Sequence, residues 1–384
     1  MTSSDPTARE KIASKLPERL RQQLKVRAAE QRVDIQDAVH EAIEVWHRTR
    51  RVPKLDTAGS RSFGTWLPPG VWQGFEEECR RRGVSNIQGL TQAVHLWLQR
   101  PAPSRQEFDM QPPRRRIMAN QKGGVGKTAL SAGVAQGYAE GSEYGGPGLR
   151  VLVVDFDPQG HLSSQLDIPS LGLDGDSLVK HMTGEAVGDL RDLVAVVKED
   201  RFGDRLHVLP SCADGFVLDV KLSTVRAREA ALERALEPLE GEYDVVIIDC
   251  PPSLGLAMDS AIFYGRTREG EEPGRSGVVI PVLAEDSSAD AFTLLTGQIE
   301  DLREDMRIEV EHLGLVVNMY DGRRGYIATS SLEHWRSLGD PEVIAVVPDR
   351  KEQREAVRSK QGLLAYDPKC DQSEIMREIA GRLG

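Results

Sequence analysis

The run KGGVGKT, Lys122–Thr128, restricts the possible folds more than any other part of the sequence. It follows a strand candidate, Arg116–Ala119, and precedes a helical pattern, ALSAGVAQGYA. Gly123, Gly124 and Gly126 allow backbone amides to turn inward around phosphate oxygens, where any Cβ would intrude. The amino end of the following helix adds its dipole to the same anion site. The run therefore predicts a phosphate-binding loop between a strand and a helix.

Two side chains of this loop carry expected chemistry. Lys127 is expected to reach the terminal phosphates of a nucleotide, and the hydroxyl of Thr128 is expected to ligate Mg²⁺. A glycine-rich turn with incidental lysines is the alternative, and the strand before and helix after the run disfavour it. The residues of the loop expected to contact nucleotide are Gly123, Gly124, Val125, Gly126, Lys127, Thr128 and Ala129.

After the loop, short apolar runs alternate with helical patterns to the end of the chain. Helices are expected over 226–239, 289–303 and 373–383. Near-continuous Val and Ile runs that alternate with helices predict an α/β domain of the P-loop NTPase type, with a mostly parallel sheet and helices on both faces. The strand candidates are 116–119, 151–154, 206–209, 245–248, 278–282, 313–317 and 343–347.

Three acidic residues follow two of these strands. VLVVDFDPQG places Asp155 and Asp157 at a strand's carboxyl end, and YDVVIIDCPPSLG ends its strand at Asp249. Ligands of α/β sheets bind at this edge. Each motif alone could be a turn at a strand end, but their order after KGGVGKT favours a shared nucleotide site. Asp249 resembles the Walker B aspartate that holds Mg²⁺ through water, and Asp155 is expected beside Mg²⁺ or in a structural role.

The loop departs from the general phosphate-loop pattern in an informative way. Gln121 stands where the first glycine would fall, and Lys122 is an additional lysine. This KGGxGK[ST] form resembles the deviant Walker-type ATPases of the ParA/MinD family. NQKGGVGKT, DFDPQG, IIDCPPSLG, VVIPVLAE and LLAYDP extend the resemblance to ParA-type members over most of residues 114–384.

The resemblance implies roles for single residues. Lys122 would reach the ATP of a partner subunit, so that ATP binding and formation of a homodimer are one event. Asp157 would orient the attacking water, and the catalytic residues would be Lys122, Lys127 and Asp157. The Mg²⁺ ligands would be Thr128, Asp249 and Asp155.

Two further segments resemble functional regions of the family. Pro348 lies where the family has a Pro-x-Asn contact to adenine, but Arg350 replaces the asparagine, and Asn318 is the alternative contact. Arg323 and Arg324 lie where the family touches DNA without reading its sequence. A solvated arginine pair is the other interpretation of these two residues.

A separate pattern is repeated at the front of the chain. KLPERLRQQLKVRAAEQRVDIQDAVHEAIEVW and WLPPGVWQGFEEECRRRGVSNIQGLTQAVHLW match with a shift of 51 residues. Each copy reads as a strand and two helices, with Asp34 or Ser85 as the cap of the second helix. The arrangement resembles the ribbon-helix-helix DNA binders, in which two paired strands enter the major groove. Lys11 and Lys15 of the first strand would then contact DNA. Trp66 on the second strand counts against DNA binding, and a plain dimerisation module is the alternative.

Charge is divided unevenly along the chain. Residues 1–116 hold 21 Lys and Arg against 14 Asp and Glu, whereas the remainder holds 28 against 46 of the totals of 49 and 60. The net charge of −11 therefore does not exclude a nucleic-acid partner for the front of the chain. We expect a DNA-binding or dimerisation region at 1–100, a linker at 101–113 and the ParA-like domain at 114–384.

These observations and the resemblance together predict a partition ATPase for plasmids or chromosomes. It would use ATP and Mg²⁺, bind DNA as a homodimer and hydrolyse ATP slowly until DNA and a ParB-like centromere-binding partner stimulate it. The N-terminus lacks an apolar signal core, so we expect a cytoplasmic, nucleoid-associated protein with no membrane partner. A nucleotide-regulated transcriptional repressor and a MinD-like positioning ATPase are the alternatives.

Overall fold

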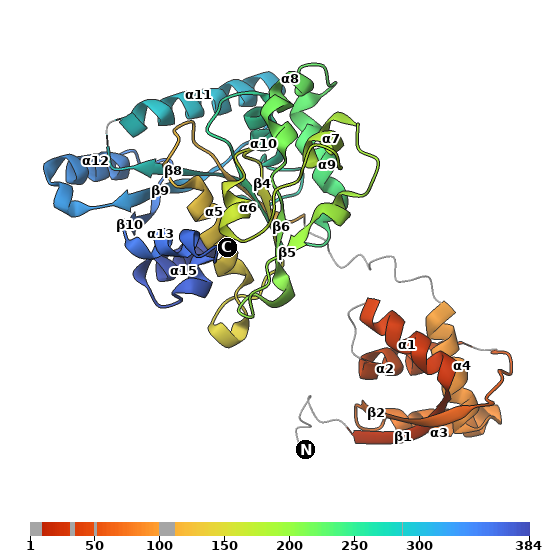
Figure 1. Ribbon diagram of the computed structural model, residues 1–384. Coiled ribbons are helices and arrows are strands. Elements are labelled where there is room, and N and C mark those ends of the chain that lie inside the picture. Colours follow the sequence, from red (N-terminus) through yellow and green to blue (C-terminus); the bar gives the residue numbers. More distant parts are fainter. Residues whose placement is uncertain (1–9, 31–34, 50–51, 100–111, 286) are drawn as a thin grey trace. The chain divides into compact units, whose positions relative to one another are not determined.

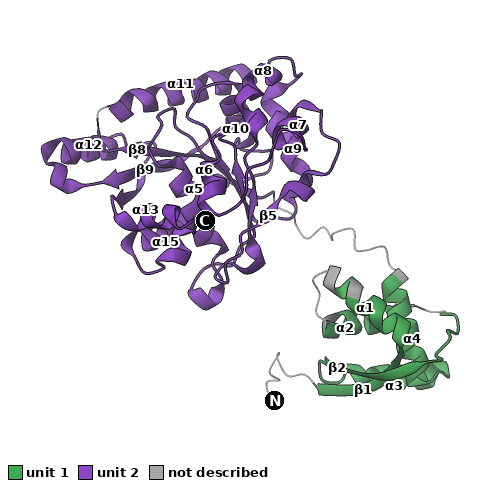
Figure 2. Ribbon diagram, viewed as in Figure 1, with its two compact units in different colours: residues 1–109 green, residues 110–384 purple. Residues whose placement is uncertain are grey.

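The computed structural model describes residues 10–30, 35–49, 52–99, 112–285 and 287–384. The chain divides into two compact units, 1–109 and 110–384 (Figure 2). Most of the expected linker, 101–113, and the expected cap Asp34 lie outside the described residues.

The N-terminal unit contains the strand–helix–helix pattern twice. Strand β1 (Glu10–Pro17) pairs antiparallel with β2 (Ser60–Leu67), from Glu10 opposite Leu67 to Pro17 opposite Ser60. This order and pairing agree with the sequence repeat, whereas membership of the ribbon-helix-helix family stays a prediction. Helices α1 (Glu18–Glu30) and α2 (Ile35–Arg48) follow the first strand, and α3 (Val71–Arg82) and α4 (Asn86–Gln99) follow the second.

The two copies exchange equivalent contacts across this unit. The indole Nε1 of Trp46 donates to Gln92 Oε1 at 3.1 Å, and that of Trp97, 51 residues later, donates to Glu41 Oε2 at 3.0 Å. Such exchange is what a twofold relation between two copies requires. The Ser85 hydroxyl accepts from Gln88 N at 3.2 Å, which confirms the expected cap of α4.

The large unit is built on an eight-stranded sheet in the order β10-β9-β8-β3-β7-β4-β6-β5 (Figure 1). The ladders from β10 to β6 are parallel, and only β5 at the edge runs antiparallel to its neighbour. All seven strand candidates are confirmed, and the two-residue β5 is the strand that the pattern did not predict. The strands are β3 (Arg114–Met118), β4 (Val151–Asp155), β5 (Ala195–Val196), β6 (Leu206–Leu209), β7 (Val245–Asp249), β8 (Gly277–Leu283), β9 (His312–Tyr320) and β10 (Val343–Pro348).

Helices cover both faces of this sheet, as expected for the fold class. In β4, Leu152 and Val154 join the core that contains α9 and α10, whereas Val151 and Val153 join the core under α5 and α15. This alternation is the period of two that a strand imposes on its side chains. The helices are α5 (Lys127–Ala139), α6 (His161–Gln165), α7 (Leu178–Thr183), α8 (Leu218–Leu222), α9 (Ala231–Glu240), α10 (Leu256–Tyr264), α11 (Ser287–Met306), α12 (Tyr326–Ser337), α13 (Lys351–Arg358), α14 (Leu363–Tyr366) and α15 (Asp371–Arg382).

Two of the three expected helices are confirmed with small shifts, and the third begins later than expected. Residues 226–239 were expected to form one helix, but α9 starts at Ala231 after a short 3-10 turn, Arg228–Ala230. Ala227 has φ of 46°, in the left-handed region, so a helix cannot run through it.

The C-terminal helix α15 packs against α5 within the large unit. Met376, Ile379 and Ala380 of α15 are buried, and Met376 and Ala380 fill the space beside Gly133 and Gly137 of α5. Among the described residues, no helix combines the length and the apolar character needed to cross a bilayer.

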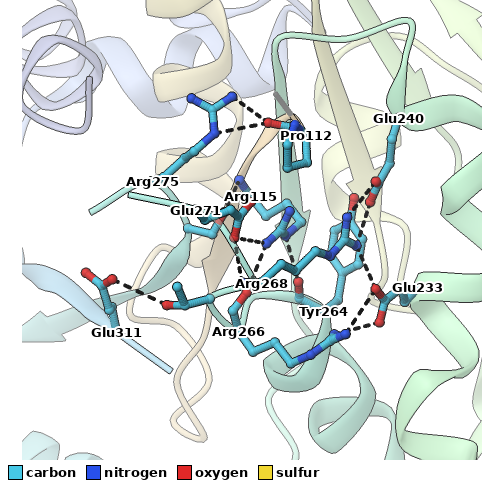
Figure 3. Close-up of polar contacts among 12 residues, drawn as sticks. Pro112, Arg115, Glu233, Glu240, Tyr264, Arg266, Arg268, Glu271, Arg275 and Glu311 are labelled. Carbon is cyan, nitrogen blue, oxygen red and sulfur yellow. Dashed lines mark hydrogen bonds and ion pairs between the residues drawn. The ribbon is translucent and has the colours of Figure 1, made fainter. Parts of the chain in front are cut away.

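Buried charges surround the amino end of the central strand β3 (Figure 3). Arg115 is fully buried and forms a 2.6 Å ion pair with Glu271, and its Nε donates to the Tyr264 carbonyl at 2.9 Å. Arg275 donates to the Pro112 carbonyl at 2.5 Å, at the point where the described chain enters this unit. The network therefore anchors the beginning of β3, and the sequence pattern did not predict it.

Candidate functional site

The phosphate loop joins β3 to α5 and is braced from outside. Asn120 accepts from Lys122 N at 2.9 Å and donates to the Pro281 carbonyl of β8 at 2.6 Å. Asn318 Nδ2 donates to the Val125 carbonyl at 2.9 Å, and a Cβ on Gly126 would overlap this same amide nitrogen. Gly126 also has φ of 87°, so both its conformation and its neighbour require glycine.

Lys127 is the first residue of α5 and its side chain folds back over the loop. The ammonium donates to the Lys122 carbonyl at 3.2 Å, and the side chain is almost completely buried. Burial lowers the pKa of Lys127, and the nearby carboxylate of Asp249 opposes that shift. A buried cation that closes a loop of glycine amides is suited to bind an anion such as a phosphate.

Asp249 and Asp155 lie in register at the ends of neighbouring strands β7 and β4. Ser131 Oγ donates to Asp249 Oδ1 at 2.9 Å, and Ser163 donates to Asp155 Oδ2 from its backbone N at 2.8 Å and its Oγ at 2.6 Å. The other oxygen of each carboxylate is buried without a hydrogen-bond partner. These two oxygens are therefore free to face a cation or its water shell.

The ionisation of the two carboxylates reflects their burial. Burial, followed by the charge of Asp155, raises the pKa of Asp249 to about 7, although the hydroxyls of Thr128 and Ser131 beside it favour the ionised form. Burial likewise raises the pKa of Asp155 to about 6. A divalent cation would remove this penalty, because it supplies the positive charge that the pair lacks.

The donor set fits Mg²⁺ that is bound largely through water and phosphate. Among the described residues, no three His, Cys, Asp or Glu side chains gather into a complete metal site. Thr128, Asp249 and Asp155 instead offer a hydroxyl and two carboxylates. Mg²⁺ commonly takes one or two protein carboxylates and completes its shell with water and substrate phosphates.

Asp157 lies in the loop after β4. Its charge raises the pKa of Lys127 and so opposes the effect of burial. Its carboxylate accepts from Gln159 N at 3.0 Å and is nearly buried. This loop therefore brings a third carboxylate to the edge that holds the phosphate loop.

Lys122 contacts its own chain in this structure. Its ammonium pairs with Glu285 and donates to Ser287 Oγ at 2.5 Å. The bond to Lys122 lowers the pKa of Glu285. Glu285 and Ser287 were not predicted, since they lie 163 and 165 residues away in sequence from Lys122.

The other expected residues lie around the same edge. Asn318 holds the loop through its amide nitrogen, and the carbonyl of Pro348 accepts from Gln372 Nε2 at 3.0 Å. Arg323 is exposed and forms a 2.8 Å pair with Asp321, and Arg324 lines a small pocket with Gly124 and Asp321. Arg350, which replaces the expected asparagine, pairs with Asp371 at 3.0 Å.

In the N-terminal unit, one face of the two paired strands is exposed to solvent. Lys11 lies opposite Trp66, and Lys15 lies opposite Ser62. Trp66 is 48% exposed, so the indole is part of this face and is not in the core. Lys11 and Lys15 therefore share one solvent-facing surface with Trp66.

This fold and this site define a phosphate-loop nucleotide-binding protein with an additional lysine in the loop. A family model described as an AAA domain matches residues 115–311, which is about half of the chain and none of the N-terminal unit. Together with the relatives below, this match shows that the chain belongs to the ParA-type ATPases.

Two relatives and one solved structure illustrate the similarity. The chromosome partitioning protein ParA of Caulobacter vibrioides is 30% identical, over 70% of this chain and 93% of that protein. The sporulation initiation inhibitor protein Soj of Bacillus subtilis is 28% identical, over 68% of this chain and 95% of that protein. The crystal structure of cobyrinic acid a,c-diamide synthase from Mycobacterium smegmatis with bound ATP analog and magnesium is 27% identical and covers 66% of this chain and 91% of its own, with a TM-score of 0.52.

Proposed function

We propose that this protein is a DNA-partition ATPase that dimerises on ATP and is reset by hydrolysis. Its cofactors are ATP and Mg²⁺. When bound, ATP supplies the phosphoanhydride bond that is hydrolysed, and Mg²⁺ neutralises negative charge on the phosphate oxygens. The observation that carries the proposal is the buried Lys127 beside two carboxylates, Asp249 and Asp155, each with one buried oxygen that has no partner.

The chain's own residues would act mainly by position and charge. The amides of the loop and Lys127 bind the phosphates, and Thr128, Asp249 and Asp155 orient the cation. Asp157, held by Gln159 N, positions the water that attacks the terminal phosphorus. Few groups transfer protons in this scheme, so we expect a slow basal rate.

Dimerisation would follow from the position of Lys122. Its ammonium contacts Glu285 and Ser287 in the single chain, and it would exchange these partners for the phosphates of the second subunit's ATP. The ammonium of Lys122 would leave the single charge of Glu285 for the larger negative charge of the partner's ATP. ATP binding would therefore favour the homodimer.

Partition requires DNA and a partner protein. We propose that the ATP-bound dimer contacts DNA phosphates through Arg323 and Arg324, and that Lys11 and Lys15 of the N-terminal unit make a separate, sequence-dependent contact. A ParB-like centromere-binding protein would stimulate hydrolysis and release the dimer from the nucleoid. The similarity to the chromosome partitioning protein ParA supports this proposal.

The first experiment measures phosphate release with Mg²⁺ and ATP, with and without duplex DNA. Lys127→Ala should abolish turnover, and Lys360→Ala, which changes an exposed lysine remote in sequence from the loop, should not. Undiminished turnover in Lys127→Ala would contradict the site. Absence of turnover under all conditions would favour a nucleotide-regulated repressor.

DNA binding separates the two proposed contacts. Arg323→Glu with Arg324→Glu should remove ATP-dependent binding to any duplex, whereas Lys11→Glu with Lys15→Glu should remove only sequence preference. If strong ATP-dependent flotation with anionic vesicles were found in place of DNA binding, a MinD-like role would replace this proposal.

A further inference from the structure

The two strands of the N-terminal unit are related by a local twofold axis. Each residue of β1 has an equivalent 51 residues later in β2, and Ala13 is paired with Gly64, which is its own equivalent. The axis therefore passes between Ala13 and Gly64. Trp46 of α2 and its equivalent Trp97 of α4 are buried in one core that the two copies share. A single chain thus forms the complete two-stranded module.

One face of this strand pair points to solvent along its whole length. We call it the ribbon face, and it consists of alternate, exposed residues of the two strands, namely Lys11, Ala13, Lys15, Ser62, Gly64 and Trp66. The residues between them, such as Ile12 and Phe63, are buried in the core beneath. The exposed Glu10 belongs to the side of β1 that Ile12 occupies, and Glu18, after the end of β1, pairs with Arg61 at 3.7 Å. The ribbon face therefore carries two lysines and no carboxylate.

The charge and dimensions of the ribbon face fit the major groove of DNA. Neither lysine forms an ion pair within the described part of this unit. Their Cα atoms lie about 13 Å apart along β1, since a strand rises about 3.3 Å per residue. Two strands about 5 Å apart fit a groove about 12 Å wide. At the centre, a Cβ on Gly64 would make only an ordinary contact with the Ile12 carbonyl at 3.8 Å, so bases have room to approach the backbone.

The side chains of the ribbon face do not obey the twofold relation of its backbone. Lys11 and Ser62 occupy equivalent positions, and so do Lys15 and Trp66. Because the strands are antiparallel, Lys11 lies opposite Trp66 at one end, and Lys15 lies opposite Ser62 at the other. One end therefore combines a cation with an indole that is 48% exposed, and the other combines a cation with a hydroxyl.

Two ends of different chemistry recognise different bases. A lysine ammonium donates to O6 and N7 of guanine, and an apolar side chain contacts the methyl group of thymine. The exposed part of the Trp66 indole is suited to such a methyl group, beside the base that Lys11 contacts. A symmetric protein reads an inverted repeat, whereas this face requires a different sequence at each end.

We propose that the ribbon face of one chain binds one DNA site that lacks twofold symmetry, and that Trp66 fixes the orientation of the chain on this site by contacting thymine. The inference rests on the proposed function in one respect, namely that Lys11 and Lys15 contact DNA. It adds the asymmetry of the site, the number of chains that bind it and a role for Trp66.

The first test selects binding sites from random duplex DNA with the full chain. Nucleotide is left out, so that the ATP-dependent contact of Arg323 and Arg324 does not contribute. The wild type should select an asymmetric sequence with thymine at one end, and sedimentation should show one chain per selected duplex. A symmetric selected site, two chains per site or no selected sequence would overturn the proposal.

Two variants sharpen this selection. Ser62→Lys with Trp66→Lys makes the charges of the ribbon face symmetric, so this double variant should select an inverted repeat. Lys25→Ala, which removes an exposed lysine of α1, is the control and should select the wild-type site. The wild-type site selected by the double variant would contradict the proposal.

The second test removes the methyl group from the DNA and leaves the protein unchanged. Deoxyuridine in place of the selected thymine should weaken wild-type binding about fourfold, the factor that corresponds to one buried methyl group. Trp66→Ser should bind the two duplexes equally, whereas Lys25→Ala should keep the wild-type difference. The wild-type difference retained in Trp66→Ser, or no difference in the wild type, would refute the role of Trp66.

These measurements need neither ATP nor hydrolysis. If the wild type selects an asymmetric site but hydrolyses no ATP, the proposed partition ATPase fails and the inference stands. If it hydrolyses ATP and binds DNA only with ATP and without a selected sequence, the inference fails alone.

Discussion

Asp249→Asn should make the nucleotide-free, metal-free protein more stable at alkaline pH while it removes Mg²⁺-dependent activity. Asp249 is fully buried, one of its oxygens has no partner, and Asp155 lies in register beside it. Its carboxylate is therefore held at a cost that only a bound cation would remove. Such a cost is expected where a site is organised for a ligand.

The magnitude follows from the pKa of about 7 in the folded chain against the ordinary value of 3.8. The folded pKa is raised, so the folded state binds more protons than the unfolded state between these values, and stability falls as the pH rises from about 4 to about 7. At about 1.4 kcal/mol per pKa unit, the cost reaches about 4 kcal/mol at pH 8 and about 2 kcal/mol at pH 5.5. Asparagine has no such dependence, so its advantage should grow by about 2 kcal/mol between the two pH values.

The assay is urea unfolding in EDTA, with the free energy of unfolding of Asp249→Asn and wild type compared at both pH values. Asp305→Asn, at an exposed position of α11, is the control and should show no such growth. The added amide needs a hydrogen-bond acceptor, which costs about 1–3 kcal/mol at both pH values and cancels in the comparison. A difference between variant and wild type that is the same at pH 5.5 and pH 8 would refute the reasoning.

Three further results are expected. Gly126→Ala should weaken nucleotide binding by at least about tenfold in a fluorescent-nucleotide titration, because the new Cβ would overlap the amide of Asn318 and the φ of residue 126 is left-handed. Adding Asn318→Ala should recover part of this loss, and a double variant without any recovery would contradict the overlap. Glu271→Gln should lower the free energy of unfolding by about 3–5 kcal/mol, because Arg115 would stay buried without its counter-charge, and a loss below about 1 kcal/mol would count against the pair. Lys122→Ala should retain ATP binding but lose ATP-dependent dimerisation in sedimentation; a dimer of wild-type affinity would show that the lysine contacts only its own chain.

The phosphate loop could be predicted because its requirements are local. Gly124 and Gly126 adopt φ of 77° and 87°, so glycine in the sequence reflects the backbone conformation directly. Asp155 and Asp249 were equally predictable, because each ends an apolar strand and parallel strands present their carboxyl ends at one edge.

The partners of these residues could not be predicted from local pattern. Ser163 and Glu285 are ordinary polar residues in their own segments. Their roles depend on which loop the fold brings beside them, and separations of up to 163 residues leave no spacing to recognise. The same reason explains why the buried pair of Arg115 with Glu271 was missed.

The sequence alone determined the class of fold, the phosphate loop, the acidic strand ends and the twofold repeat of the N-terminal unit. Each depends on backbone conformation or on a periodicity of two or about 3.6, which neighbouring residues carry by themselves. The tertiary structure alone decided that Lys122 pairs with Glu285 and that Asn318 holds the Val125 carbonyl of the phosphate loop. These are contacts between distant segments, and they exist only because strand order places those segments together.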